Sequence, residues 1–161
     1  MKDIFIIVVT FNSADFIERS ILNIKTVISL SRLIIIDNNS SDRTVSIVKK
    51  YKQVILIENF KNLGYGEGNN LGIDYALKHK AEYVFIVNPD IYVYKEALRK
   101  LLEHINIDKK IGIIGPLILD SKKRIWSKGG EVDKKRFTAG LIDYKKKVAD
   151  IKEEIKDVAF L

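Results

Sequence analysis

Cysteine is absent from the sequence, which excludes disulfide bonds and thiolate metal sites and fits a reducing, cytoplasmic environment. No apolar run approaches the roughly 18 to 20 residues that a membrane helix needs. The apolar run of residues 4–9 is also too short for the core of a signal peptide, so a β-strand is the better interpretation. These absences leave a globular protein as the class of this chain. A chain of 161 residues has the length of one domain and is large enough to bury roughly 70% of its unfolded surface.

Positive charge is concentrated near the end of the sequence. The chain has a net charge of +7, and residues 122–161 contribute +5 of it, from twelve Lys or Arg and seven acids. A solvated, charge-rich surface is the first interpretation. The alternative is a patch that faces anionic lipid headgroups or a phosphorylated acceptor, which would place the protein at the inner face of a membrane. Nucleic acid is disfavoured as a partner, because few aromatic residues lie between the basic ones as stacking platforms.

Apolar, β-branched runs alternate with segments of helical periodicity up to about residue 119. One helical segment, residues 65–79, carries Gly68, Gly72 and Ala76 four residues apart, and small residues at that spacing let a helix approach a sheet or a ligand closely. The alternation predicts an α/β fold with a mainly parallel, twisted, Rossmann-like sheet and helices on both faces. The expected strands are residues 4–9, 32–36, 53–58, 82–87 and 111–119.

The pattern changes after residue 120. Gly129, Gly130 and Gly140, with short mixed stretches between them, predict an irregular segment of hairpins and loops. Residues 158–161 read as a strand that begins where the chain stops, and domains rarely end inside an apolar run. We therefore expect an α/β core over residues 1–120 and an incomplete second region over residues 121–161, within a longer protein.

A polar turn follows each of the first four expected strands. The carboxyl ends of parallel strands share one edge of a sheet, where open α/β sheets bind their ligands, so the turns predict one binding site. Ser41 and Asp42 also suit helix caps, and Asn38 and Asn39 a tight turn. Asp37 directly follows an apolar strand and is less easily explained in that way. The candidate residues in these turns are Thr10, Phe11, Asn12, Asp37, Asn39, Asn62, Gly64, Asn69, Asn88 and Asp90.

Asp90 is the most informative of these candidates. Residues 82–87 suit a buried strand, and Pro89 prevents the ladder of that strand from continuing. Asp90 is therefore expected at the carboxyl end of the strand. A carboxylate in this place can hold a divalent cation, and the cation can hold a diphosphate. The structural alternative is an aspartate that caps the next helix.

The glycine-rich stretch of residues 64–70 does not match the common phosphate-binding fingerprints. It follows the third expected strand rather than the first, and Asn69 stands where the last glycine of G-x-G-x-x-G belongs. No Gly-Lys-Ser or Gly-Lys-Thr occurs, so a Walker loop is absent as well. These departures disfavour an NAD- or methyl-donor-binding Rossmann protein and a sugar-nucleotide pyrophosphorylase. What remains is a loop whose backbone can pass close to a ligand, before a helix N-terminus that favours negative charge.

Four stretches together resemble the family 2 glycosyltransferases, whose nucleotide-sugar-binding fold is called GT-A. Each stretch is a weak signal alone, whereas four in this order are a strong one. Their order and spacing are most similar to the rhamnosyltransferase-like branch, and the resemblance covers residues 3–120 closely and the remainder weakly. The stretches are Val-Val-Thr-Phe-Asn at 8–12, Ile-Ile-Asp-Asn-Asn-Ser-Ser-Asp at 35–42, Asn-Leu-Gly-Tyr-Gly-Glu-Gly-Asn-Asn at 62–70 and Val-Asn-Pro-Asp at 87–90.

The resemblance implies roles for the nucleotide-binding candidates. Thr10 and Phe11 would line the pocket for the nucleobase and the ribose, and Asp37 would accept a hydrogen bond from the base edge. The pocket beside the nucleotide and the donor sugar would be shaped by Asn62, Gly64 and Asn69. The same nucleotide-sugar site would include Asn12 and Asn39.

The resemblance also implies a metal. Asn88 and Asp90 would take the place of the family's Asp-x-Asp motif, with Asp90 holding Mg²⁺ or Mn²⁺. Mg²⁺ needs few protein carboxylates, because it keeps several waters and binds the substrate phosphates. Asn88 departs from the first aspartate of the motif, and a contact with the ribose is its alternative role.

The implied reaction is transfer of a sugar, with inversion, from a dTDP- or UDP-linked donor to a hydroxyl of a glycan or lipid-linked acceptor in cell-surface polysaccharide synthesis. Such an attack needs a general base. In this family the base lies downstream of the strand that residues 158–161 would begin, so we expect it beyond Leu161. Residues 121–161 would then be the start of the acceptor side, and we expect this chain to bind a nucleotide-sugar but to transfer slowly or not at all. The alternative is a non-catalytic nucleotide-sugar-binding or interaction module that retains the fold.

Overall fold

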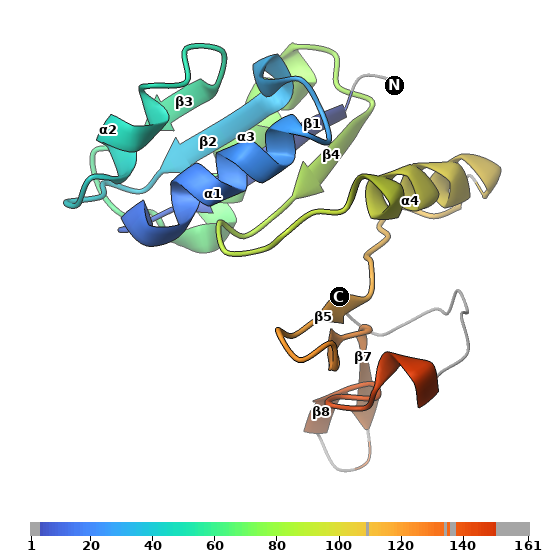
Figure 1. Cartoon of the computed structure of the whole chain (residues 1–161). Helices are drawn as coiled ribbons and strands as arrows, with labels where there is room; N and C mark the ends of the chain where they lie inside the picture. The colour runs from blue at the N-terminus through green and yellow to red at the C-terminus, as the bar shows by residue number, and fades with distance from the viewer. Residues whose placement is uncertain (1–3, 109, 134, 136–137, 151–161) are drawn as a thin grey trace. The chain divides into compact units, whose positions relative to one another are not determined.

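The computed structural model describes residues 4–108, 110–133, 135 and 138–150 (Figure 1). They divide into two units, one up to Lys95 and one from Glu96 onward. The first unit alternates strands and helices along the chain. Its elements are β1 (Ile4–Thr10), α1 (Ala14–Lys25), the short 3-10 helix η1 (Leu30–Arg32), β2 (Leu33–Asp37), α2 (Thr44–Val48), β3 (Ile55–Glu58), α3 (Gly64–Lys78) and β4 (Tyr83–Ile86).

A parallel sheet with the strand order β3-β2-β1-β4 forms the centre of the first unit. Every residue of β1 and β2 is buried, as continuous Ile and Val runs require in a sheet that is covered on both faces. The helices α1 and α2 lie together on one face, and α3 covers the other (Figure 1). The predicted α/β fold with a mainly parallel sheet and helices on both faces is therefore confirmed.

The small residues of α3 bring the helix close to the sheet. A Cβ atom on Gly68 would lie 2.8 Å from Cγ1 of Val9, and one on Gly72 would lie 2.6 Å from Cγ2 of Ile7. Ala76, the third residue of the stripe, is fully buried in the same core as Ile7 and Val9. The predicted close approach is thus an approach to the sheet. Since α3 begins with the glycine-rich loop, this packing also fixes the loop against the carboxyl ends of β1 and β2.

Replacing Gly72 by alanine is expected to lower the free energy of unfolding. The new methyl group would meet the fully buried Ile7, and overpacking of this kind costs about 1–3 kcal/mol. That cost exceeds the roughly 1 kcal/mol that alanine gains over glycine in a helix. Gly66→Ala is the matched control, because a Cβ atom at Gly66 has no neighbour within 4 Å; it should raise stability by up to about 1 kcal/mol. Urea denaturation of both variants measures this, and shifts of the same sign would contradict the packing argument.

The second unit consists of one helix followed by short hairpins. Its elements are α4 (Lys95–Ile107), which begins at the boundary, then β5 (Ile118–Leu119), β6 (Ile125–Ser127), β7 (Gly130–Asp133), β8 (Thr138–Leu141) and the 3-10 helix η2 (Val148–Asp150). β5 pairs with β6 and β7 with β8, both antiparallel. The expected irregular segment of hairpins and loops is confirmed. The division expected at residue 120 stays a prediction.

The fifth expected strand, residues 111–119, is wrong for most of its length. Only Ile118 and Leu119 form a strand, and they pair with β6 rather than with the parallel sheet. Gly112, Gly115 and Pro116 interrupt the apolar run, and 83% of Ile113 is exposed. Apolar composition alone predicted a strand here, whereas glycine and proline favour an irregular backbone.

No helix within the described ranges is long and apolar enough to cross a membrane. The strand expected at residues 158–161 lies outside the described residues, and Leu161 lies outside them with it. The general base expected beyond Leu161 therefore has no counterpart to compare in this structure, and its position stays a prediction.

Candidate functional site

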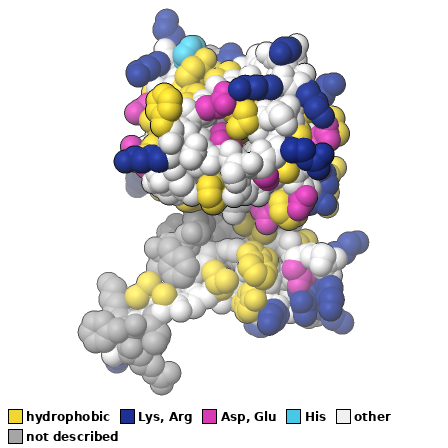
Figure 2. All heavy atoms as spheres, turned by 90° about the vertical axis from the view of Figure 1, so that its left-hand side faces the viewer, with side chains coloured by type: hydrophobic (Ala, Val, Ile, Leu, Met, Phe, Trp, Pro, Cys, Tyr) yellow, Lys and Arg dark blue, Asp and Glu magenta, His cyan; other side chains and the backbone are white. Residues whose placement is uncertain are grey.

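The predicted site residues all lie in the first unit, at the carboxyl ends of its strands, in the loops that follow them and in the first two turns of α3. The register pairs Thr10 of β1 with Asp37 of β2, and Asp37 with Glu58 of β3, so these three strands end at the same level. Figure 1 shows the arrowheads of β2 and β3 at the left, and Figure 2 views the molecule from that side. There, uncharged side chains and backbone occupy most of the face of this unit, with acidic groups between them and Lys and Arg around them (Figure 2).

A buried carboxylate joins the ends of β1 and β2. Asp37, 2% exposed, accepts a hydrogen bond at Oδ1 from the Thr10 hydroxyl at 3.1 Å. Ser40 donates twice to the same carboxylate, from its hydroxyl to Oδ1 at 2.5 Å and from its backbone N–H to Oδ2 at 2.8 Å. A carboxylate in the interior needs such partners, because its desolvation is otherwise uncompensated. Thr10 and Asp37, predicted from separate turns, are therefore in direct contact.

Asn12 extends this network between the loops that follow β1 and β2. Its backbone N–H donates to the Ser40 hydroxyl at 2.9 Å, and its side-chain Oδ1 accepts from the Ser41 backbone N–H at 2.8 Å. Its φ of 49° lies in the left-handed region, which asparagine adopts more readily than most residues. Phe11, the residue before it, is 50% exposed. The network thus holds the backbone on either side of an accessible aromatic ring.

Asp42 caps two helices at once. Its Oδ2 accepts the backbone N–H of Ala14, the first residue of α1, at 3.0 Å, and its Oδ1 accepts the N–H of Thr44, the first residue of α2, at 2.9 Å. Partial desolvation raises the pKa of Asp42, but the hydrogen bonds from Thr44 and Ala14 outweigh it and hold the pKa below its usual value. The capping role predicted for Asp42 is confirmed, and it extends across two segments of the chain.

Asn38 holds the loops after β2 and β3 and the start of α3 together, and the sequence argument missed it as a site residue. Its Nδ2 donates to the Gly64 carbonyl at 3.0 Å, and its Oδ1 accepts from Nδ2 of Asn59 at 2.8 Å. The side chain is 2% exposed. Asn38 reads as a turn residue from its type alone. The register of β2 and β3, which sets Asp37 beside Glu58, is the signal that places the next residues, Asn38 and Asn59, side by side.

The glycine-rich loop after β3 begins α3. Asn62 accepts the Gly64 backbone N–H on its Oδ1 at 2.8 Å, and Gly64 has a φ of 83° that favours glycine. Asn69, in the second turn of α3, is 6% exposed, and its side-chain oxygen has no hydrogen-bond partner among the described residues. Asn39 differs from these residues, because it is exposed at the tip of its turn with a φ of 66°.

Asn88 and Asp90 lie in a turn after β4, on the other side of β1 from Asp37. The backbone N–H of Val87 donates to the Ile7 carbonyl at 3.0 Å, so the turn begins beside the last residues of β1. The turn closes with a 3.2 Å hydrogen bond from the Ile91 N–H to the Asn88 carbonyl. Both side chains are exposed, and neither has a hydrogen-bond partner among the described residues. The turn therefore shares the sheet edge of the network at Asp37 without a hydrogen bond to it.

A buried asparagine of α1 fixes the segment after this turn. The Asn23 side chain donates to the Val93 carbonyl at 3.0 Å and accepts the Val93 N–H at 2.7 Å. It pairs with Val93 as a neighbouring strand would, although residues 91–94 belong to no helix or strand. The same segment displays Tyr92 and Tyr94 on the surface, with ring centroids 4.9 Å apart. Sequence periodicity offered no sign of this clamp.

No group of three or more His, Cys, Asp and Glu that could hold a metal occurs in the described part of the chain. A metal at Asp90 would therefore have at most two such side chains of the described residues, Asp90 among them, and Asn88 lies two residues away in the same turn. This donor set fits a hard cation that takes its other ligands from water and from substrate phosphates, as Mg²⁺ does. It does not fit a cation that requires an all-protein cage.

Comparisons with known proteins agree with this architecture. The model of a family described as Glycosyl transferase family 2 matches residues 5–151. The chain is 33% identical over 122 residues to the low-salt glycan biosynthesis hexosyltransferase Agl10 of Haloferax volcanii, covering 74% of this chain and 38% of that protein. It is also 33% identical over 134 residues to the poly(ribitol-phosphate) beta-N-acetylglucosaminyltransferase TarP of Staphylococcus aureus, covering 77% of this chain and 39% of that protein.

A solved structure shows the same fold. The crystal structure of S. aureus TarS 1-349 in complex with UDP superimposes with a TM-score of 0.54 and 27% identity, covering 66% of this chain and 32% of that one. The chain spans only about two fifths of the length of the curated relatives that it matches, 38% and 39%.

Proposed function

Because the chain belongs to glycosyl transferase family 2, we propose that its first unit binds the nucleoside-diphosphate part of a sugar donor at the carboxyl edge of the sheet. The observation that carries this proposal is the joining of the loops after β1, β2 and β3 around two buried side chains, Asp37 and Asn38. Segments far apart in the sequence are thereby fixed around one face of polar groups. Such an edge is where open α/β sheets bind nucleotides.

The loops divide into a supporting layer and an exposed layer. The Asp37 carboxylate already accepts three hydrogen bonds, from Thr10 and Ser40, so it orders the pocket and retains acceptor capacity mainly on Oδ2, for a base N–H. The exposed Phe11 ring offers a flat surface to the nucleobase or ribose, and Asn39 offers a side-chain amide at the same edge. The similarity to TarS, solved with UDP, supports a uridine nucleotide as the first ligand to test. A dTDP-linked donor and rhamnose as the sugar stay predictions.

The proposal includes a divalent cation at Asp90. Asp90 and Asn88 would hold the cation, and a bound Mg²⁺ or Mn²⁺ would neutralise charge on the departing diphosphate. The Val87–Ile7 hydrogen bond and the Asn23 clamp fix the backbone on both sides of this turn. The exposed side chains in the turn can therefore approach a ligand while the backbone that carries them stays in place.

For the whole protein, the proposed reaction is sugar transfer with inversion. An acceptor hydroxyl oxygen attacks the anomeric carbon, the bond from that carbon to the diphosphate breaks, and the hydroxyl proton passes to a general base. The acceptor, a glycan or a lipid-linked sugar in cell-surface polysaccharide synthesis, is part of the proposal because the chain matches only part of its relatives. The proposal also includes a general base, which we place beyond Leu161. It further includes a cytoplasmic location and a peripheral contact with a membrane.

Titration calorimetry of the 161-residue chain with UDP, dTDP and GDP, each with and without Mn²⁺, tests the proposal. We expect one nucleotide to bind in preference to the others and Mn²⁺ to increase its affinity. AMP serves as the matched control ligand, because it lacks the diphosphate that the cation would bridge. If none of the diphosphates binds with or without the metal, the chain is an interaction module that retains the fold, and the proposal fails.

A further inference from the structure

One segment of the second unit holds a net charge as large as that of the whole chain. Residues 121–147 contain ten Lys or Arg and three acids, a net charge of +7 that equals the charge of all 161 residues. The rest of the chain is therefore neutral overall. Figure 2 shows Lys and Arg side chains of this unit gathered beside hydrophobic ones. Charge concentrated in this way attracts an anionic ligand and raises its local concentration.

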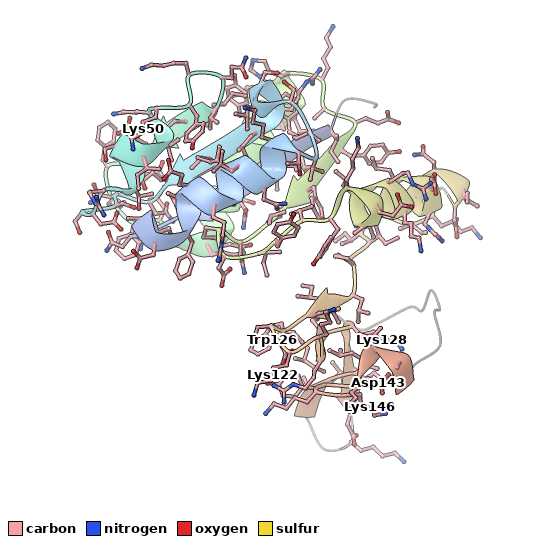
Figure 3. All side chains as sticks on the ribbon, viewed as in Figure 1. Lys50, Lys122, Trp126, Lys128, Asp143 and Lys146 are labelled. Carbon is pink, nitrogen blue, oxygen red and sulfur yellow. The ribbon has the colours of Figure 1, made fainter. Side chains whose placement is uncertain are left out.

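Two carboxylates fix the framework of this surface. Asp120 accepts hydrogen bonds from two backbone N–H groups of its own turn, at 2.9 Å each, and pairs with the Arg124 guanidinium at 2.7 Å. Asp143 pairs with Lys146 at 2.6 Å and Lys128 at 3.3 Å (Figure 3). The Arg124 N–H lowers the pKa of Asp120, and Lys146 lowers the pKa of Asp143. These acids are thus occupied within the unit and do not neutralise the other lysines.

Five described lysines of residues 121–147 have no ion pair to another described residue, and three of them, Lys122, Lys123 and Lys147, lie around one turn. Lys122 and Lys123 lie at the tip of the turn that Asp120 holds, where Lys123 has a φ of 57°. Lys147 lies across from Arg124 in an antiparallel bridge at the base of that turn. An exposed lysine without a partner acts as a point charge for phosphate groups.

An aromatic pair lies beside these lysines. Trp126 is 54% exposed, although its neighbour Ile125 is 1% exposed, because alternate residues of β6 face opposite sides. The Tyr144 ring meets the Trp126 ring edge-on with centroids 5.8 Å apart, and the Lys145 ammonium lies 5.0 Å from the Tyr144 centroid. Figure 3 places Trp126 and Lys122 on the same side of the unit. An indole that packs against a tyrosine and is exposed among cations marks a contact surface.

We infer that the surface formed by residues 122–128 and 144–147 binds a phosphate-bearing glycan, with a sugar ring packing on Trp126 and phosphate groups contacting Lys122, Lys123 and Lys147. Both halves of the ligand follow from the surface: the flat indole suits the apolar face of a sugar ring, and the unpaired ammonium groups suit repeated phosphates. A single Trp–Tyr pair offers one stacking platform rather than the series that a single-stranded nucleic acid uses. The choice of a glycan over other polyanions rests on the proposed function.

Fluorescence anisotropy of a labelled phosphomannan oligosaccharide with the 161-residue chain, at low ionic strength, tests this inference. Trp126→Ala should weaken binding about tenfold, as loss of a central aromatic contact does. The double variant Lys122→Gln/Lys123→Gln should also weaken binding about tenfold, and its deficit should shrink as salt is added. Lys50→Gln/Lys52→Gln removes the same charge from exposed positions of the first unit (Figure 3 labels Lys50) and should change the affinity less than twofold.

Four results would overturn the inference. The first two are an affinity for the oligosaccharide that phosphatase treatment does not change, and an equal loss of affinity in the two lysine double variants. The other two are tighter binding to phosphatidylglycerol vesicles than to the phosphomannan, and tighter binding to oligo(dT) than to the phosphomannan. The vesicle result would assign the surface to a membrane, and the oligo(dT) result to nucleic acid. Calorimetry with UDP on the same variants separates this inference from the proposed function. UDP should bind every variant as it binds the parent chain, whereas failure of UDP, dTDP and GDP alike to bind the parent chain would count against the proposed function.

Discussion

Asp90→Asn is expected to abolish the increase in nucleotide affinity that Mn²⁺ produces, while binding of the nucleotide without metal stays unchanged. The substitution keeps the shape of the side chain but removes the negative charge that attracts the cation. Loss of even an outer-shell partner weakens metal affinity about 10- to 100-fold, so removal of the direct carboxylate ligand should cost at least about tenfold. Calorimetry with UDP in the presence and absence of Mn²⁺ measures both affinities.

The fold should tolerate this substitution. The Asp90 side chain is exposed and has no hydrogen-bond partner among the described residues. Thermal unfolding of the Asp90→Asn variant should therefore match that of the parent chain. Asp74→Asn provides a matched control, because Asp74 is an exposed aspartate of α3 in the same unit. The Asp74→Asn variant loses the same charge, and Mn²⁺ should raise its affinity for UDP as much as it does in the parent chain. A variant at Asp90 that still responds to Mn²⁺ would show that the cation is held elsewhere.

The parallel sheet was predictable because its central strands are buried on both faces. A strand in that position must be apolar at every residue, and the runs in β1 and β2 satisfy this without interruption. The same reasoning failed at residues 111–117, because an apolar run broken by Gly112, Gly115 and Pro116 has no ladder to join. Periodicity detects which residues seek burial, whereas pairing with a particular neighbouring strand depends on residues far away in the sequence.

The sequence predicted which loops form the candidate site, but not which side chains contact one another in it. The turns after the strands necessarily gather at one edge once the strands are parallel, which brought Thr10, Asp37 and Gly64 to the same part of the molecule. Which side chains hold those loops together depends on register. Asn38, Ser40 and their partners could be identified only after β2 was aligned with its neighbours. The role of Asp37 toward a nucleotide, like that of the other candidates, stays a prediction until a ligand is bound.

Asn23→Ala is expected to lower the free energy of unfolding by about 2–4 kcal/mol. The substitution removes both hydrogen bonds to Val93 and leaves a backbone N–H and a carbonyl without partners at a residue that is 6% exposed. Each buried group left unsatisfied costs about 1–3 kcal/mol, whereas the gain in helix propensity from asparagine to alanine is only about half a kcal/mol. Urea denaturation measures the difference.

Asn70→Ala is the control for this prediction, since Asn70 is an asparagine of α3 whose loss should change stability by no more than about 0.5 kcal/mol. Hydrogen exchange gives a second, local measurement: the Val93 amide should exchange faster in Asn23→Ala and at the parent rate in Asn70→Ala. Because Asn23 fixes the backbone just beyond the Asp90 turn, its loss should also weaken the effect of Mn²⁺ on UDP affinity. A destabilised Asn23 variant whose Val93 amide stays protected and whose metal effect is intact would show that the turn after β4 is held by other contacts.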